Sequence, residues 1–134
     1  MNSVCEERFV NAFVEPRVRD RYRSLLLSTR RRKDLLNGWN HNAKFAPKFI
    51  SNMAPAHATD QRTALRAVMA SATELYVIVD GSDHDGTFVS SEQAIELLMG
   101  HSWATLCIVD PDKLAIFRQE SPAPIQVLKR TGRG

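Results

Sequence analysis

Residues 75–100 read LYVIVDGSDHDGTFVSSEQAIELLMG, and this stretch decides the fold. Residues 75–79 form a short, continuous apolar run rich in β-branched side chains, which predicts a buried strand. Ser90 or Ser91 is a suitable N-cap for a helix with an apolar face, and Gly100 is a suitable end for it. The chain therefore passes from a strand, through an acidic loop, into a helix.

Two more strands are predicted after this helix. Residues 103–109 form a second apolar run, and residues 114–117 form a third one after the turn sequence DPDK. A strand, a helix and a strand in succession favour a right-handed parallel crossover, and the last two strands are close enough to form a hairpin. We therefore predict a small mixed sheet with the order β-α-β-β over residues 73–120, followed by a flexible tail over residues 121–134.

The chain before this stretch, residues 1–72, is predicted to be mainly helical. Apolar side chains recur at helical spacing after Ser3 and again after Pro16. We place a new helix start at Ser28 and Thr29, because a continued helix would turn Arg and Lys side chains onto its apolar face. With 134 residues the chain fits one α+β domain, in which helices pack on the sheet. The predicted core includes Leu25, Leu26, Ile78, Leu98 and Ile108.

The composition argues against several classes of protein. Hydrophobic residues make up 43% of the chain and charged residues 25%, as is ordinary for a soluble globular protein. No apolar run approaches the roughly 18 residues of a membrane span, and the first residues lack the pattern of a signal peptide. The two cysteines form no C-x-x-C pair, which argues against a disulfide framework or a cysteine zinc site. We therefore expect a cytoplasmic protein with no cofactor and no membrane partner.

The acidic loop after the first strand is one candidate site. Asp80, Asp83 and Asp85 lie close together there, and Asp110 follows the second predicted strand. If the two strands are parallel, their ends meet at one edge of the sheet, where carboxylates would hold Mg²⁺. This alternative is a small Mg²⁺-dependent phosphoryl-transfer or nuclease-like enzyme. The simpler interpretation is a solvated surface turn, because turns favour Asp, Gly and Ser.

Parts of this loop resemble motifs of known families. DHDGTF at residues 83–88 resembles the D-x-D-G-T motif of haloacid-dehalogenase-like phosphatases, but Asp83 stands beyond the strand end where that family places its nucleophile. An EF-hand alignment puts Gly81 at the first ligand position, where a carboxylate is needed. VIVDGSD and CIVDPDK resemble the acidic motifs of the topoisomerase–primase domain, although Asp80 replaces its glutamate. We therefore expect no tight metal binding.

The back part of the chain, from LYVIVDGSDHDGTF through ATLCIVDPDKLAIF, also resembles a group of short bacterial proteins. They share the order strand, DG loop, helix, strand, turn and strand. No activity is established for that group, so the resemblance implies an α/β arrangement and transfers no functional residue.

The basic run RRRK at residues 30–33 is the other candidate site. Positive charge gathers in residues 1–50, which contain 11 Lys and Arg against 5 Asp and Glu. If Thr29 caps a helix, four cations occupy its first turn, which is the wrong sign for the helix dipole. Such a local conflict often marks function, although cations paired on a solvated helix face are the alternative. We predict a non-enzymatic binding or regulatory module that engages an acidic protein or nucleic acid through Arg30, Arg31, Arg32 and Lys33.

Overall fold

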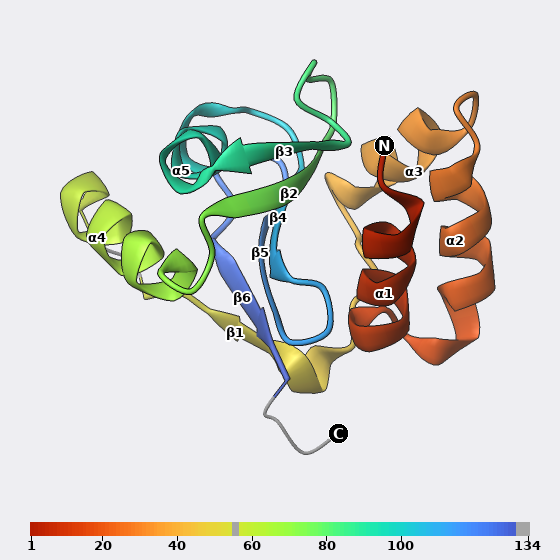
Figure 1. The fold of residues 1–134 in the computed structure, drawn as a ribbon, viewed down its shortest axis with the longest axis horizontal. Helices are drawn as coiled ribbons and strands as arrows, with labels where there is room; N and C mark the ends of the chain where they lie inside the picture. The colour runs from red at the N-terminus through yellow and green to blue at the C-terminus, as the bar shows by residue number, and fades with distance from the viewer. Residues whose placement is uncertain (55–56, 131–134) are drawn as a thin grey trace.

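An antiparallel sheet forms the centre of the protein in the computed structural model, which describes residues 1–54 and 57–130. Its strands in chain order are β1 (Ile50–Asn52), β2 (Glu74–Val79), β3 (Thr87–Ser90), β4 (Thr105–Asp110), β5 (Leu114–Arg118) and β6 (Gln126–Lys129). Across the sheet their order is β1-β6-β5-β4-β2-β3, as Figure 1 shows.

Five α-helices in the described part of the chain cover this sheet. They are α1 (Ser3–Phe13), α2 (Arg19–Leu27), α3 (Arg32–Trp39), α4 (Ala58–Met69) and α5 (Ser91–Gly100). The first three pack on one face of the sheet and the last two on the other (Figure 1). The predicted α+β class is confirmed. No helix in residues 1–54 or 57–130 has both the length and the apolar character to cross a membrane.

The parallel crossover predicted for the first two long strands is wrong. β2 and β4 run antiparallel, with Tyr76 opposite Ile108 and Val79 opposite Thr105. The physical reason is β3, a strand too short to be predicted from the sequence, which turns back along β2 before α5 begins. This extra reversal brings the chain into β4 in the opposite direction. The sheet is therefore antiparallel throughout, and the predicted mixed sheet is corrected.

The flexible tail predicted over residues 121–134 is wrong for its middle part. Residues 126–129 form β6, which pairs with β5 on one side and β1 on the other. Leu128 on this strand is fully buried and belongs to the core beneath α1, so burial of one large side chain fixes the strand. Residues 131–134 of the predicted tail lie outside the described residues.

Coverage on both faces explains why β2 is apolar at successive positions. Tyr76 and Ile78 face the core under α1, α2 and α3, whereas Leu75, Val77 and Val79 face the core under α4 and α5. Successive side chains of a strand point to opposite faces, so a strand buried on both sides needs apolar residues throughout.

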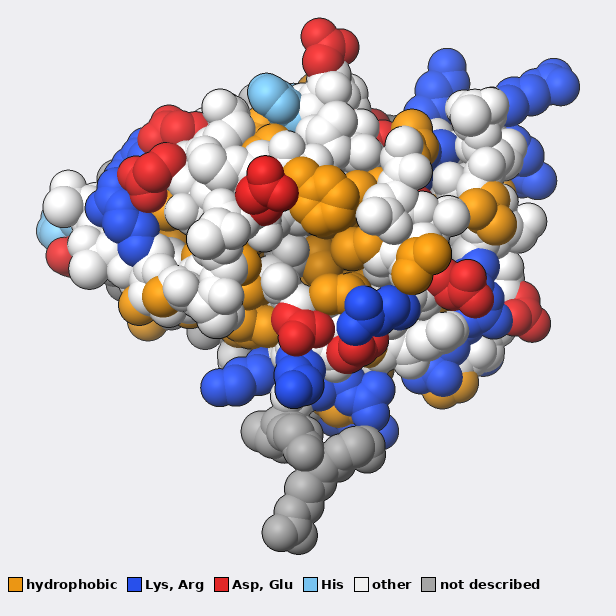
Figure 2. All heavy atoms as spheres, in the orientation of Figure 1, with side chains coloured by type: hydrophobic (Ala, Val, Ile, Leu, Met, Phe, Trp, Pro, Cys, Tyr) orange, Lys and Arg blue, Asp and Glu red, His pale blue; other side chains and the backbone are white. Residues whose placement is uncertain are grey.

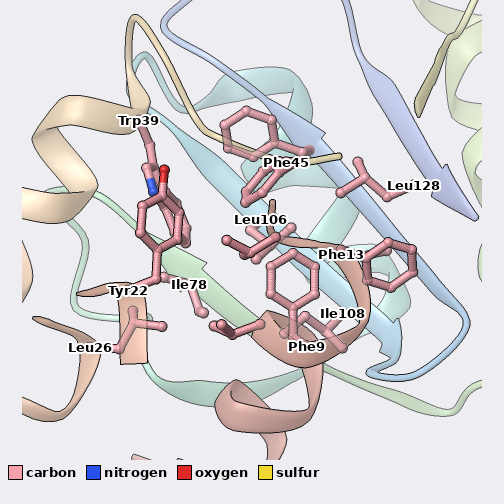
Figure 3. Close-up of a cluster of buried hydrophobic side chains, with 14 of the residues drawn as sticks. Phe9, Phe13, Tyr22, Leu26, Trp39, Phe45, Ile78, Leu106, Ile108 and Leu128 are labelled. Carbon is pink, nitrogen blue, oxygen red and sulfur yellow. The ribbon is translucent and has the colours of Figure 1, made fainter. Parts of the chain in front are cut away.

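The core between the first three helices and the sheet is rich in aromatic rings (Figure 3). Trp39 and Phe45 meet edge to face at 5.3 Å between ring centroids, and Phe45 meets Phe117 of β5 in the same way at 4.9 Å. Edge-to-face contacts of this kind add to the stabilisation from burial. The core residues predicted from the sequence are all buried: Leu25, Leu26, Ile78, Leu98 and Ile108.

The predicted break between α2 and α3 is confirmed, although α3 begins at Arg32 and not at Thr29. Ser28 organises the turn between the two helices. Its hydroxyl accepts a hydrogen bond from the backbone N–H of Arg31 at 3.1 Å, and its carbonyl accepts one from the N–H of Arg32 at 2.8 Å. Arg30 and Arg31 therefore lie in the turn, and only Arg32 and Lys33 of the basic run stand in the helix.

Candidate functional site

The two candidate sites found in the sequence lie beside each other in the fold. The start of α3 and the loop between β2 and β3 line one open hollow of about 340 Å³. Thr29, Arg32 and Lys33 line it from the helix side, and residues 80–83 together with Asp85 line it from the loop. The basic run and the acidic loop therefore form one region of the molecule.

Arg32 lies at the bottom of this region and is only 3% exposed. Its Nη1 and Nη2 atoms donate to the two carboxylate oxygens of Glu6 at 2.8 and 2.6 Å. Its Nε and Nη2 atoms donate to the two oxygens of Asp85 at 2.8 and 3.0 Å, and Nη1 also reaches the carbonyl of Leu26 at 3.2 Å. Both carboxylates are thus bound bidentately, the strongest arrangement for an arginine.

This pairing corrects the prediction for Arg32. Its guanidinium is enclosed and already carries two carboxylates, so it cannot meet a partner as its neighbours in the run can. Burial alone would lower the pKa of Arg32, but the hydrogen bonds that it donates to Glu6 and Asp85 outweigh that effect and raise the pKa above its ordinary value. The side chain stays charged and joins α3 to α1 and to the loop after β2.

Tyr76 of β2 extends the network to the sheet. Its hydroxyl donates to Glu6 at 2.7 Å and accepts from the backbone N–H of Asn2 at 3.0 Å. Burial, followed by the hydrogen bond to Glu6, raises the pKa of the Tyr76 hydroxyl well above its usual range. Asp85 accepts in addition from the backbone N–H of Val79 at 3.0 Å. We call Glu6, Arg32, Tyr76 and Asp85 the buried network.

No local pattern in the sequence indicates the buried network. Its ion pairs join residues 26 and 53 positions apart, which no helical or strand spacing connects. The spacing of Ser3 and Glu6 in the sequence is that of a capping box, in which the Glu6 side chain would bond back to the start of the helix. In the structure Asn2 caps α1 by accepting from the N–H of Cys5 at 3.1 Å, and the Glu6 side chain points inward.

The four aspartates of the alternative metal site do not converge. Asp85 binds Arg32, Asp80 accepts from the side-chain amide of Asn40 at 2.8 Å, and Asp83 is exposed in the loop. Asp110 lies at the other end of the sheet, because β4 is antiparallel to β2. In the part of the chain that the structure describes, no three His, Cys, Asp or Glu side chains gather as metal ligands. The arrangement that the alternative Mg²⁺ site requires, with Asp80 and Asp110 at one edge of the sheet, is therefore not found among these residues.

The remaining cations of the basic run are exposed. Arg30, Arg31 and Lys33 form no ion pair with any residue in 1–54 or 57–130. Arg31 also lines a second hollow, of about 260 Å³, together with Arg21 and Lys44. Figure 2 shows Lys and Arg side chains gathered at this end of the molecule, where Figure 1 places α3 and the end of α2. We use the name α2–α3 basic surface for the following five residues: Arg21, Arg30, Arg31, Lys33 and Lys44.

Comparisons with known proteins add no precedent for either feature, since no family model, curated protein or solved structure matches this chain. The resemblance of residues 75–117 to short bacterial proteins therefore stays a prediction.

Proposed function

We propose that this protein is a non-enzymatic binding module that engages an acidic segment of a partner protein through the α2–α3 basic surface. The observation that carries the proposal is a difference in pairing. Arg62 and Arg66 on α4 are matched with Glu96 and Glu92 on α5. Within the described residues, by contrast, Arg30, Arg31 and Lys33 have no carboxylate partner. Unmatched cations at close quarters repel one another, and an anionic partner relieves that repulsion.

The buried network supports this surface from below. Arg32 is the residue directly after Arg31, and two carboxylates hold it in place. The turn that carries Arg30 and Arg31 is therefore attached to a fixed point. A pre-organised binding surface loses less conformational entropy on association than a mobile one, which favours binding.

Carboxylates near the surface favour an acidic protein segment over a nucleic acid strand. Asp34 shares the second hollow with Arg31, and Asp80 and Asp83 line the first hollow together with Lys33. A continuous row of phosphates would meet these carboxylates, whereas a short acidic segment can contact the cations between them. We further propose a cytoplasmic setting, which the two free cysteines support.

The first prediction is that Arg30→Gln combined with Arg31→Gln weakens binding to a glutamate-rich peptide. We expect a loss of about three- to tenfold at low salt, because two exposed charge contacts disappear. The dependence of the affinity on salt concentration should also flatten. Fluorescence anisotropy of the labelled peptide over a salt series measures both effects.

Lys113→Gln combined with Lys129→Gln is the matched control. It removes the same charge in the turn just before β5 and at the end of β6, and both lysines are exposed. The control should bind the peptide within about twofold of the wild-type protein, as expected for unspecific charge effects. An equal loss in both variants, or no binding by the wild-type protein at low salt, would refute the proposal. Tighter binding of duplex DNA than of the peptide would assign the surface to nucleic acid instead.

A further inference from the structure

A second arginine, Arg118 at the end of β5, is also buried, with 5% of its surface exposed. All the hydrogen bonds that the Arg118 side chain donates to described residues come from its Nη2 atom. This nitrogen donates to the backbone carbonyl of His101, to that of Trp103 at 2.9 Å, and to the hydroxyl of Thr105 at 3.4 Å. These acceptors fix one end of the guanidinium but carry no net charge.

Arg118 differs from Arg32 because no carboxylate in residues 1–54 or 57–130 pairs with it. Glu120, the nearest acid along the chain, lies 3.6 Å from the imidazole of His41 instead. Burial lowers the pKa of Arg118, yet a guanidinium does not lose its proton in a protein. The fold therefore holds a buried positive charge without a counter-ion, which is costly unless a ligand compensates it.

The same side chain lines a hollow of about 340 Å³ on the α4 and α5 side of the sheet. Within the described residues its Nε atom is enclosed without a partner, and Nη2 is already used, so Nη1 is the donor left for a ligand. Apart from Arg118, Gln61 and Ser121 the walls are apolar. They are formed by Met53, Leu98, Met99 and residues 122–125.

We propose that this hollow binds a small organic carboxylate with an apolar body. The carboxylate would pair with Arg118, and the apolar body would contact the methionine and leucine side chains beside it. The volume lies within the range of small-molecule sites, which combine apolar walls with a few fixed polar groups. The site lies on the opposite face of the sheet from α1, α2 and α3, and it is independent of the α2–α3 basic surface.

Hexanoate and its uncharged analogue hexanamide test the proposal on the wild-type protein. The methyl signals of Met53 and Met99, followed by NMR during titration, report on the hollow directly. We expect hexanoate to shift both signals with a Kd of the order of 1 mM or tighter. Hexanamide should bind about tenfold more weakly, because it lacks the charge that pairs with Arg118.

A loss of hexanoate binding in Arg118→Gln alone would be ambiguous, because this substitution also removes the hydrogen bonds to two backbone carbonyls. Ala123→Phe is therefore the decisive variant, since this half-buried residue lines the hollow and a larger side chain fills part of it. Hexanoate binding should be lost in this variant while its melting temperature stays close to that of the wild-type protein. Equal affinity for hexanoate and hexanamide, unmoved methionine signals, or undiminished binding by Ala123→Phe would each overturn the proposal. If Ala123→Phe does not fold, the comparison of the two ligands on the wild-type protein decides alone.

Discussion

At the scale of single residues, neighbours in the basic run have different roles. Arg31 is exposed, whereas Arg32 is enclosed by Glu6 and Asp85. The two carboxylates also offset the unfavourable position of this cation in the first turn of α3. The charge conflict expected from the sequence is thus offset at Arg32 by distant residues and persists in the helix at Lys33, whereas Arg30 and Arg31 lie in the turn before α3.

The second prediction is that Arg32→Gln destabilises the protein by about 3–5 kcal/mol, because the substitution leaves two carboxylates facing each other without their cation. Arg31→Gln is the control one residue away. It should change the free energy of unfolding by no more than about 0.5 kcal/mol, since this side chain is exposed and unpaired among the described residues. Urea unfolding of the two variants measures the difference. Similar values for both would mean that the buried network contributes little to stability.

At the scale of elements, the long apolar runs were predictable and the short strands were not. β2, α5, β4 and β5 each carry a pattern of their own, and Ser90 caps α5 as expected by accepting from the N–H of Gln93 at 3.1 Å. β1, β3 and β6 have three or four residues each. So few residues show no reliable alternation, and pairing with a neighbouring strand determines their conformation.

The missed strands account for the errors in topology. Without β3 the chain from β2 to β4 looks like a parallel crossover, and that assumption placed Asp80 and Asp110 at one edge of the sheet. The acidic loop and the basic run can both be recognised as candidate sites from their residue types alone. Their meeting in one region, and the pairing of Arg32 with Asp85, depend on tertiary packing that no local spacing reveals.

The third prediction tests β6 as part of the core. Leu128→Ala should cost about 2–5 kcal/mol, because a fully buried side chain is truncated beneath α1. Lys129→Ala on the same strand should cost no more than about 0.5 kcal/mol, because this residue is exposed. Thermal or urea unfolding distinguishes the two variants. A loss below about 1 kcal/mol for Leu128→Ala would restore the prediction of a flexible tail.

At the scale of the whole molecule, each face of the sheet holds one buried arginine in a different setting. Arg32 on the α1–α3 side is neutralised by the chain itself, and Arg118 on the α4–α5 side has no carboxylate partner within the described residues. The basic surface with the buried network beneath it occupies one side of the protein, and the hollow at Arg118 occupies the other. The two proposed sites can therefore be tested separately.

The most direct test of the central claim is a map of where an acidic partner binds. A backbone-amide NMR titration with the glutamate-rich peptide should shift the signals of residues 29–31, 33 and 34 and of Arg21 and Lys44, which belong to or flank the α2–α3 basic surface. The signal of Arg32 should move only slightly, because its backbone N–H is bonded to the carbonyl of Ser28 and its side chain remains in the buried network. Shifts concentrated on β5, β6 or α4, or no shifts at low salt, would contradict the claim that this surface is the binding site.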